Sequence, residues 1–152
     1  MKQQETIDYL LKVVWQNVSN TYNQIASGFG ITQAIGYVLI NIDQEGIAVS
    51  QLAGLLGVKA TSLSRILSNM EESGLIYREA ALGDKRSVKV FLTDYGREKR
   101  KLAKDVVRSF NEYLNANLTI KEKNGLVQSL QKLNKLTLAY TVTTENDEQK
   151  DK

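Results

Sequence analysis

In the segment from Ala60 to Gly74, the residues best suited to binding chemistry have short hydrogen-bonding side chains, and one has a guanidinium. They are Thr61, Ser62, Ser64, Arg65, Ser68 and Asn69. Side chains of these types can reach the base edges and phosphates of a nucleic acid. A helix face that only needed to be soluble would more often carry Glu and Lys. Because Ser and Thr are common everywhere, an ordinary amphipathic surface helix remains an alternative for this segment taken alone.

The same segment has the apolar pattern of a helix with one buried side. Apolar residues recur at Leu63, Ile66, Leu67 and Met70, with spacings of three, one and three residues. These spacings fit a period of about 3.6 residues and predict one buried stripe. The polar side chains are then left free on the opposite face.

The residues after this helix predict a β-hairpin with a basic tip. Gly74 suits a helix C-terminus that needs a positive φ, and the apolar residues 75–77 that follow predict a strand. A second strand is expected at 87–92, where Val88, Val90 and Leu92 alternate with Lys89 and Phe91. The loop at 80–86 carries the turn formers and cations Gly83, Asp84, Lys85 and Arg86.

A short helix is expected before the polar segment, at residues 50–56, and Gly57 is expected to turn the chain into the next helix. Helix, turn, helix and hairpin together form a winged helix-turn-helix. The expected fold is therefore mainly α with a small β-hairpin wing.

The chain from Leu52 to Gly96 resembles the MarR family of bacterial transcriptional regulators. The resemblance lies in the runs LAGLLGV, TSLSRIL, ESGLIYR and GDKRSVKVFLTDYG. Its most specific parts are Gly74-Leu75-Ile76, Asp84-x-Arg86 and Leu92-Thr93-x-x-Gly96. The chain departs from the family at the expected helix N-caps, where Ala48 and Lys59 stand in place of Ser or Thr. The resemblance implies a homodimeric repressor that binds a palindromic operator in double-stranded DNA.

The residue types and the resemblance together define the expected DNA-binding residues. They are Lys59, Thr61, Ser62, Ser64, Arg65, Asn69, Lys85 and Arg86. We expect the helix residues to enter the major groove and Arg86 to reach phosphate or the minor groove. The resemblance further implies that Asp84 orients Arg86.

Long helices are expected on both sides of this module, which spans about residues 31–92. The first covers about 5–27, and Thr32 is the expected N-cap of the next. Residues 93–142 are expected to form two helices. The first has some 24 residues and directs five apolar side chains inward, namely Leu102, Val106, Phe110, Tyr113 and Leu114. The second begins with a Thr119–Glu122 capping box. The apolar surface of the last helix is too wide for one buried face, which predicts dimerisation. We therefore expect one domain at 1–142, with helices 5–27 and 93–142 forming the dimer, and a disordered tail at 143–152.

The positive charge is concentrated in the module expected to bind DNA. The 152 residues carry a net charge of +3. Residues 59–108 hold 12 basic and 7 acidic side chains, whereas residues 1–58 hold 2 and 4 and residues 109–152 hold 6 and 6. The run of charged residues at 97–101 is interpreted as the solvated face of a helix. The prediction of DNA binding therefore depends on the cations at the hairpin tip.

The composition excludes several classes of function. The chain has no Cys and no His, so disulfides, thiolate zinc sites and Ser-His or Cys-His nucleophiles are excluded. The glycine pairs 28/30 and 54/57 follow no predicted strand and do not resemble a phosphate-binding loop. We expect no catalytic residue, no metal and no cofactor. Without an apolar stretch of eighteen residues or a signal peptide, the chain is expected to be cytoplasmic.

The resemblance also implies a small aromatic or anionic effector in a crevice between the dimer helices and the DNA-binding module. The candidates to line it are Trp15, Tyr22, Tyr37 and Phe110. Each taken singly is more typical of a core residue. Because the chain has no Cys, peroxide sensing is excluded and the effector must bind reversibly. A winged helix that binds proteins and has no sequence-specific contact with DNA is the alternative function.

Overall fold

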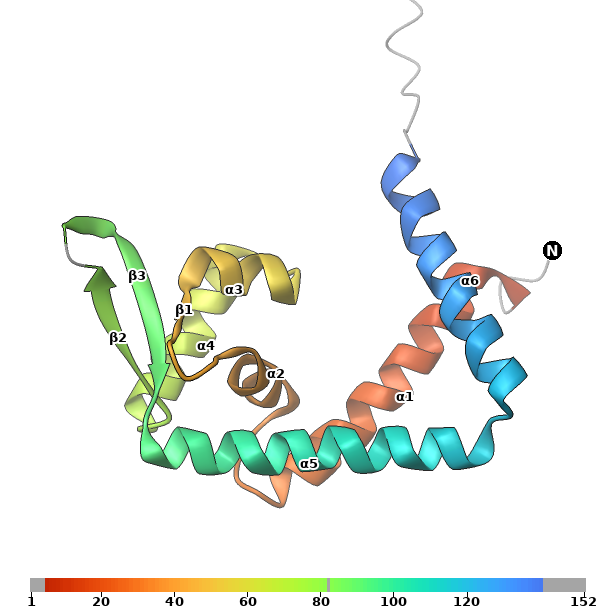
Figure 1. The fold of residues 1–152 in the computed structure, drawn as a ribbon, viewed down its shortest axis with the longest axis horizontal. Helices are drawn as coiled ribbons and strands as arrows, with labels where there is room; N and C mark the ends of the chain where they lie inside the picture. The colour runs from red at the N-terminus through yellow and green to blue at the C-terminus, as the bar shows by residue number, and fades with distance from the viewer. Residues whose placement is uncertain (1–4, 82, 141–152) are drawn as a thin grey trace, which may run out of the picture. The chain divides into compact units, whose positions relative to one another are not determined.

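The computed structural model describes residues 5–81 and 83–140, and the chain divides into two compact units, 1–109 and 110–152. The first unit holds a winged helix-turn-helix preceded by a long helix (Figure 1). In chain order the elements are α1 (Ile7–Ser27), α2 (Gln33–Asn41), β1 (Ile47–Ala48), α3 (Val49–Leu56), α4 (Ala60–Glu72), β2 (Ile76–Ala81), β3 (Asp84–Leu92), α5 (Asp94–Asn117) and α6 (Ile120–Ala139). The predicted fold class is confirmed. The predicted disordered tail at 143–152 lies outside the described residues.

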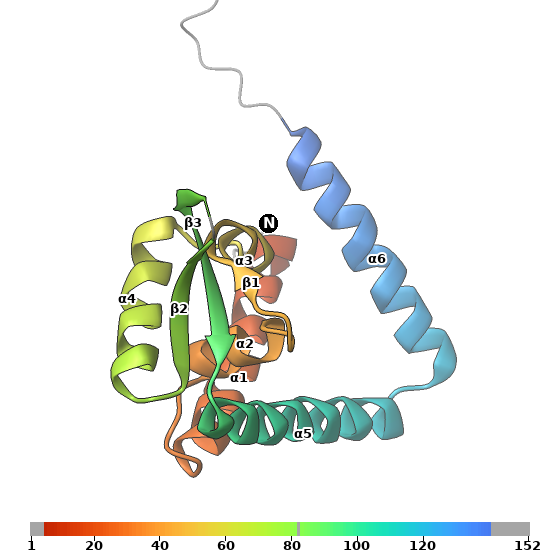
Figure 2. The ribbon, with the colours of Figure 1, turned by 60° about the vertical axis from the view of Figure 1, so that its left-hand side comes forward.

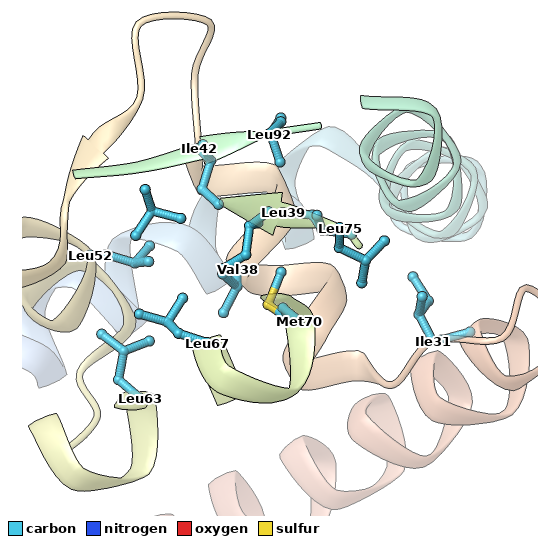
Figure 3. Close-up of a cluster of buried hydrophobic side chains, with 13 residues drawn as sticks. Ile31, Val38, Leu39, Ile42, Leu52, Leu63, Leu67, Met70, Leu75 and Leu92 are labelled. Carbon is cyan, nitrogen blue, oxygen red and sulfur yellow. The ribbon is translucent and has the colours of Figure 1, made fainter. Parts of the chain in front are cut away.

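One hydrophobic core holds the first unit together, and α4 supplies a large part of it (Figure 3). Leu63, Leu67 and Met70 are at most 1% exposed, as the spacing of the apolar residues predicts. They pack with residues of α2, α3 and the sheet, among them Val38, Leu39, Leu52, Ile76 and Val90. Burying a side chain of this size contributes about 1.5–3 kcal/mol. The rotation of α4 about its own axis is therefore fixed by its buried stripe.

The wing is one part of a three-stranded antiparallel sheet with the order β1-β3-β2. The predicted hairpin is present, but the sequence analysis missed β1, which pairs Ile47 with Val90. A strand of two residues is too short to show alternation. Gly46 precedes it with a φ of +75°, and a Cβ there would lie 2.6 Å from the Phe91 ring.

The helix ends follow the predicted signals. The Thr32 hydroxyl accepts a hydrogen bond from the Ile35 amide at 3.2 Å, and Gly57 and Gly74 both have positive φ. Ala48 and Lys59 are the N-caps of α3 and α4 and provide no side-chain cap. In α6 the Thr119–Glu122 capping box is complete.

The first turn of α5 packs directly on the turn that ends α4. The Thr93 amide donates to the Leu75 carbonyl at 3.2 Å, and the Thr93 hydroxyl donates to the Gly74 carbonyl. The same hydroxyl accepts from the Gly96 amide at 2.9 Å, which caps α5. A Cβ on Gly96 would lie 1.9 Å from the Leu75 carbonyl oxygen, so only glycine permits this approach.

The second unit contains the end of α5 and the whole of α6. Tyr113 and Leu114 were expected to point inward, but they are 63% and 36% exposed in this chain. The apolar residues of α6, including Leu126 and Leu130, are also largely exposed. The inward prediction is wrong for Tyr113 and Leu114 in the single chain, whereas Leu102, Val106 and Phe110 are half-buried. The helical period cannot tell a buried face from one that needs a partner.

We predict that Gly96→Ala lowers the free energy of unfolding by roughly 1–3 kcal/mol, because the added methyl group overlaps the Leu75 carbonyl. Gly54→Ala is the control, since a Cβ at this position in α3 meets no atom within 4 Å. It should stabilise the chain by up to about 1 kcal/mol. Urea denaturation measures both effects, and equal stability of the two variants would contradict the prediction.

Candidate nucleic-acid interface

The outer face of α4 carries the predicted polar side chains, and they are unengaged. Thr61, Ser62, Ser64, Arg65 and Asn69 are exposed, and Ser68 is half-buried. Within residues 5–81 and 83–140, the side chains of these five exposed residues have no hydrogen bond or ion pair. Their hydroxyl, amide and guanidinium groups can therefore bind an external partner without breaking an internal contact.

The N-terminus of α4 is open as well. Lys59 is exposed and its carbonyl accepts from the Leu63 amide at 3.1 Å, but its side chain does not cap the helix. Among the residues that the structure describes, the first amides of α4 have no side-chain acceptor. Free amides and the helix dipole make such an end favourable for an anion.

The C-terminus of α4 is held by an ion pair with the wing. Nε and a terminal nitrogen of Arg78 in β2 donate to one carboxylate oxygen of Glu71 at 3.0 and 2.6 Å. This hydrogen bond from Arg78 is the main reason why the pKa of Glu71 lies below its usual value. The pair joins α4 to β2, the strand that lies beside it in Figure 2.

The wing places its three candidate residues at the beginning of β3. The strands extend further into the predicted 80–86 loop than expected, with Ala81 paired to Asp84 and Gly83 at a φ of +89°. Residues 84–86 therefore lie at the end of the hairpin farthest from α5 (Figure 1). The side chains of Asp84, Lys85 and Arg86 fall outside the described part, so the orienting role of Asp84 stays a prediction.

The cations of residues 97–101 are not simply a solvated face, as the sequence analysis had interpreted them. The Lys99 ammonium donates to the Phe29 carbonyl at 2.7 Å, and Arg97 donates to the Leu92 carbonyl at 3.1 Å. Arg100 is half-buried. Charge alone cannot reveal such contacts, because long cationic side chains bury their stems along apolar surface.

Three of the four candidate pocket residues come together. The rings of Trp15 and Tyr37 stack at 6.2 Å, and Tyr22 meets Tyr37 edge-on at 6.4 Å. Burial is the main cause that raises the pKa of Tyr22. Phe110 belongs to the second unit and lines neither of the cavities formed by these rings.

Two cavities adjoin these rings. A small one of about 40 Å³ is lined by Tyr22 and Tyr37, and an open groove of about 600 Å³ is lined by Trp15 and Tyr37. Gln33 lines both, and its Nε2 is buried without a hydrogen-bond partner. The sequence analysis missed Gln33, because a glutamine after a helix N-cap carries no signal of a site.

Among the described residues, no group of three or more acidic side chains is arranged to hold a metal ion. In the same part of the chain no helix combines the length and apolar character needed to cross a membrane.

Comparison with known proteins finds a similar family and similar regulators. A family model described as "MarR family" matches residues 37–88, which run from α2 through the wing. The HTH-type transcriptional regulator SarZ of Staphylococcus epidermidis is 26% identical over 125 residues, covering 81% of this chain and 82% of that protein. Over residues 37–88 this chain is therefore similar to the MarR family. An HTH-type transcriptional repressor of Mycobacterium tuberculosis is 27% identical over 128 residues, covering 84% of this chain and 92% of that one.

Solved MarR-type structures have the same fold. MepR of S. aureus in complex with DNA superposes with a TM-score of 0.80 at 23% identity, covering 86% of this chain and 97% of that one. A mutant of MarR from E. coli complexed with operator DNA gives a TM-score of 0.77 at 28% identity, covering 88% and 98%. SarZ and the mycobacterial repressor are both named as transcriptional regulators and not as enzymes, in agreement with the prediction that the chain is not an enzyme.

We predict that Glu71→Gln destabilises the chain at neutral pH and that this difference disappears in acid. The pKa of Glu71 is lowered in the folded chain, so the contribution of the pair is present above the unfolded value of about 4.3. It is lost as the pH falls through the lower folded pKa. Urea denaturation of parent and variant across this range measures the difference.

Glu72→Gln is the matched control, because Glu72 is exposed and has no ion pair among the described residues. A parent-to-variant difference for Glu71→Gln that stays constant from neutral pH into acid would contradict the role of the pair.

Proposed function

We propose that this MarR-like protein regulates transcription by binding double-stranded DNA through α4 and the wing. The observation that carries the proposal is the unengaged polar face of α4, which the buried Leu63, Leu67 and Met70 direct outward. Complexes of MepR with DNA and of MarR with operator DNA, both of the same fold, support it. A protein-binding module with no DNA contact would not need an exposed Arg surrounded by Ser and Thr.

In this proposal α4 reads sequence and the wing adds affinity. Arg65 can bond a guanine edge with two donors, Asn69 can bond adenine, and Ser62 and Ser64 can bond several bases. Thr61, Lys59 and the open helix N-terminus contact phosphates. Lys85 and Arg86 of the wing, with Arg86 oriented by Asp84, reach phosphate or the minor groove.

We predict different losses for the two parts. Arg65→Ala should weaken binding to a preferred sequence by about 1–3 kcal/mol, roughly 5- to 150-fold, and random DNA much less. Arg86→Ala should weaken both alike and reduce the slope of log K against log salt by about 0.9. Fluorescence anisotropy over a salt series measures these quantities.

Lys101→Ala is the control, since Lys101 is an exposed cation on α5 outside the proposed interface. The proposal fails if Arg65→Ala and Lys101→Ala bind the preferred sequence equally well.

We further propose that the protein acts as a homodimeric repressor on a palindromic operator. The apolar side chains on α1 and on α6, each helix taken by itself, support dimerisation. Val14 is 59% exposed and Leu130 is 43% exposed, and Ile7, Leu10, Leu126 and Leu136 are exposed as well. Exposed apolar surface of this extent indicates a protein interface. A twofold axis would set two copies of α4 about 34 Å apart, one turn of B-DNA.

Leu130→Glu should make the protein monomeric at micromolar concentration, because a carboxylate would be buried in the dimer interface. Gln131→Glu is the control, since the same charge is added at the adjacent exposed position of α6. Sedimentation velocity distinguishes monomer from dimer. A parent protein that sediments as a folded monomer would rule out the dimer.

We also propose that a small aromatic or anionic effector binds the groove at Trp15 and Tyr37. The stacked rings and the Gln33 Nε2, which has no hydrogen-bond partner among the described residues, support this site. To loosen DNA 30- to 100-fold, the effector must favour the DNA-free form by about 2–3 kcal/mol.

Aromatic carboxylic acids should quench the emission of the single Trp15, and DNA should compete with them. Gln33→Leu should lower their affinity roughly 2- to 12-fold by removing the amide donor, whereas Gln24→Leu on exposed α1 surface should not. If no acid in the panel alters Trp15 emission, the groove is not the effector site.

A further inference from the structure

A separate pocket lies at the base of the wing, at the end of the hairpin opposite its tip. It has a volume of about 140 Å³ and is formed by the turn after α2, the inner ends of β2 and β3, and the first turns of α5. Its walls include Asp43, Tyr77, Phe91, Arg97 and Arg100. None of these residues lines the groove at Trp15.

Arg100 brings an unsatisfied charge to this pocket. Its Nε is buried without a hydrogen-bond partner, and its guanidinium makes no ion pair within the described residues. A buried N–H donor without an acceptor is costly. The guanidinium therefore favours an anion, and its parallel donors match a carboxylate.

The other charged groups of the pocket are already engaged. Arg97 donates to the Leu92 carbonyl at 3.1 Å and pairs with Asp94. An oxygen of Asp43 accepts from the Glu45 amide at 2.9 Å. Among the described residues, Arg100 is thus the charged lining group that still lacks a partner.

Two stacked rings, Tyr77 and Phe91, form the apolar wall of the same pocket. Tyr77 and Phe91 face each other across β2 and β3, with centroids 5.3 Å apart and planes 16° from parallel. Gly46 lies against the Phe91 ring so closely that a Cβ would stand 2.6 Å from it. This contact fixes the Phe91 ring in place. Tyr77 is 43% exposed, which leaves its ring accessible.

We infer that this pocket binds a small anion that carries its charge beside a flat apolar group, as benzoate does. The carboxylate pairs with Arg100 and the ring packs on the Tyr77–Phe91 wall. The site does not depend on DNA binding, because all of its lining residues belong to this one unit and none lies on the exposed face of α4.

The test is a titration of the isotope-labelled full chain with three probes, followed by ¹H–¹⁵N NMR. Benzoate should move the Arg100 Nε resonance and the backbone amide of Phe91 along one saturating curve. Acetate provides the charge without the ring and benzyl alcohol provides the ring without the charge, so both should bind more weakly than benzoate. The titration continues until benzoate no longer changes Trp15 emission or, if Trp15 emission does not respond, until benzoate reaches its solubility limit. Arg100 and Phe91 signals that stay unchanged over this whole range would overturn the inference.

Paired variants then test the charge. Arg100→Gln should lower the affinity for benzoate at the Phe91 amide roughly tenfold or more. Lys101→Gln, which removes the same charge from an exposed neighbour on α5, should leave it unchanged. Equal losses in the two variants would indicate general charge attraction and would overturn the site. The parent titration gives its answer even if Arg100→Gln fails to fold.

Discussion

The contact between the first turn of α5 and the turn that ends α4 is the constraint on which the rest of the structure depends. At this point α4 ends, β2 begins, β3 ends and α5 begins. Thr93 binds the carbonyls of Gly74 and Leu75, and Gly96 lets the α5 backbone approach the Leu75 carbonyl. Because buried backbone groups must be paired, this junction allows little variation in how the elements meet.

The junction and the core together explain how α4 is presented. The apolar stripe of the helix fixes its rotation, and the Glu71–Arg78 pair and the Gly74 turn tie its end to β2. The polar face then has no side-chain partner within the part of the chain that the structure describes, and the core supports it from behind. Binding sites held on rigid elements keep their geometry, which is what recognition of base edges requires.

Much of this arrangement could be predicted from the sequence. The spacing of Leu63, Leu67 and Met70, the N-cap at Thr32 and the glycines at 57 and 74 are local signals, and each produced the predicted element. These signals act within a few residues of the chain. The outward polar face of α4 follows directly from them.

The rest depends on contacts between distant segments, which no local pattern records. Strand β1 has only two residues, and it is defined by pairing with β3 some forty residues later. Lys99 binds the carbonyl of Phe29, and Arg100 enters a pocket formed with the α2–β1 turn and the wing, although both stand in a run that reads as solvated. The burial of the apolar side chains of α6 could not be predicted either, because a helical period does not specify what covers a face.

The central claim is that α4 reads DNA sequence, and selection of binding sites from a pool of random duplexes tests it most directly. The account predicts enrichment of an imperfect palindrome whose half-site centres lie about 10 base pairs apart. Selected duplexes with the same sequence distribution as the starting pool would contradict it.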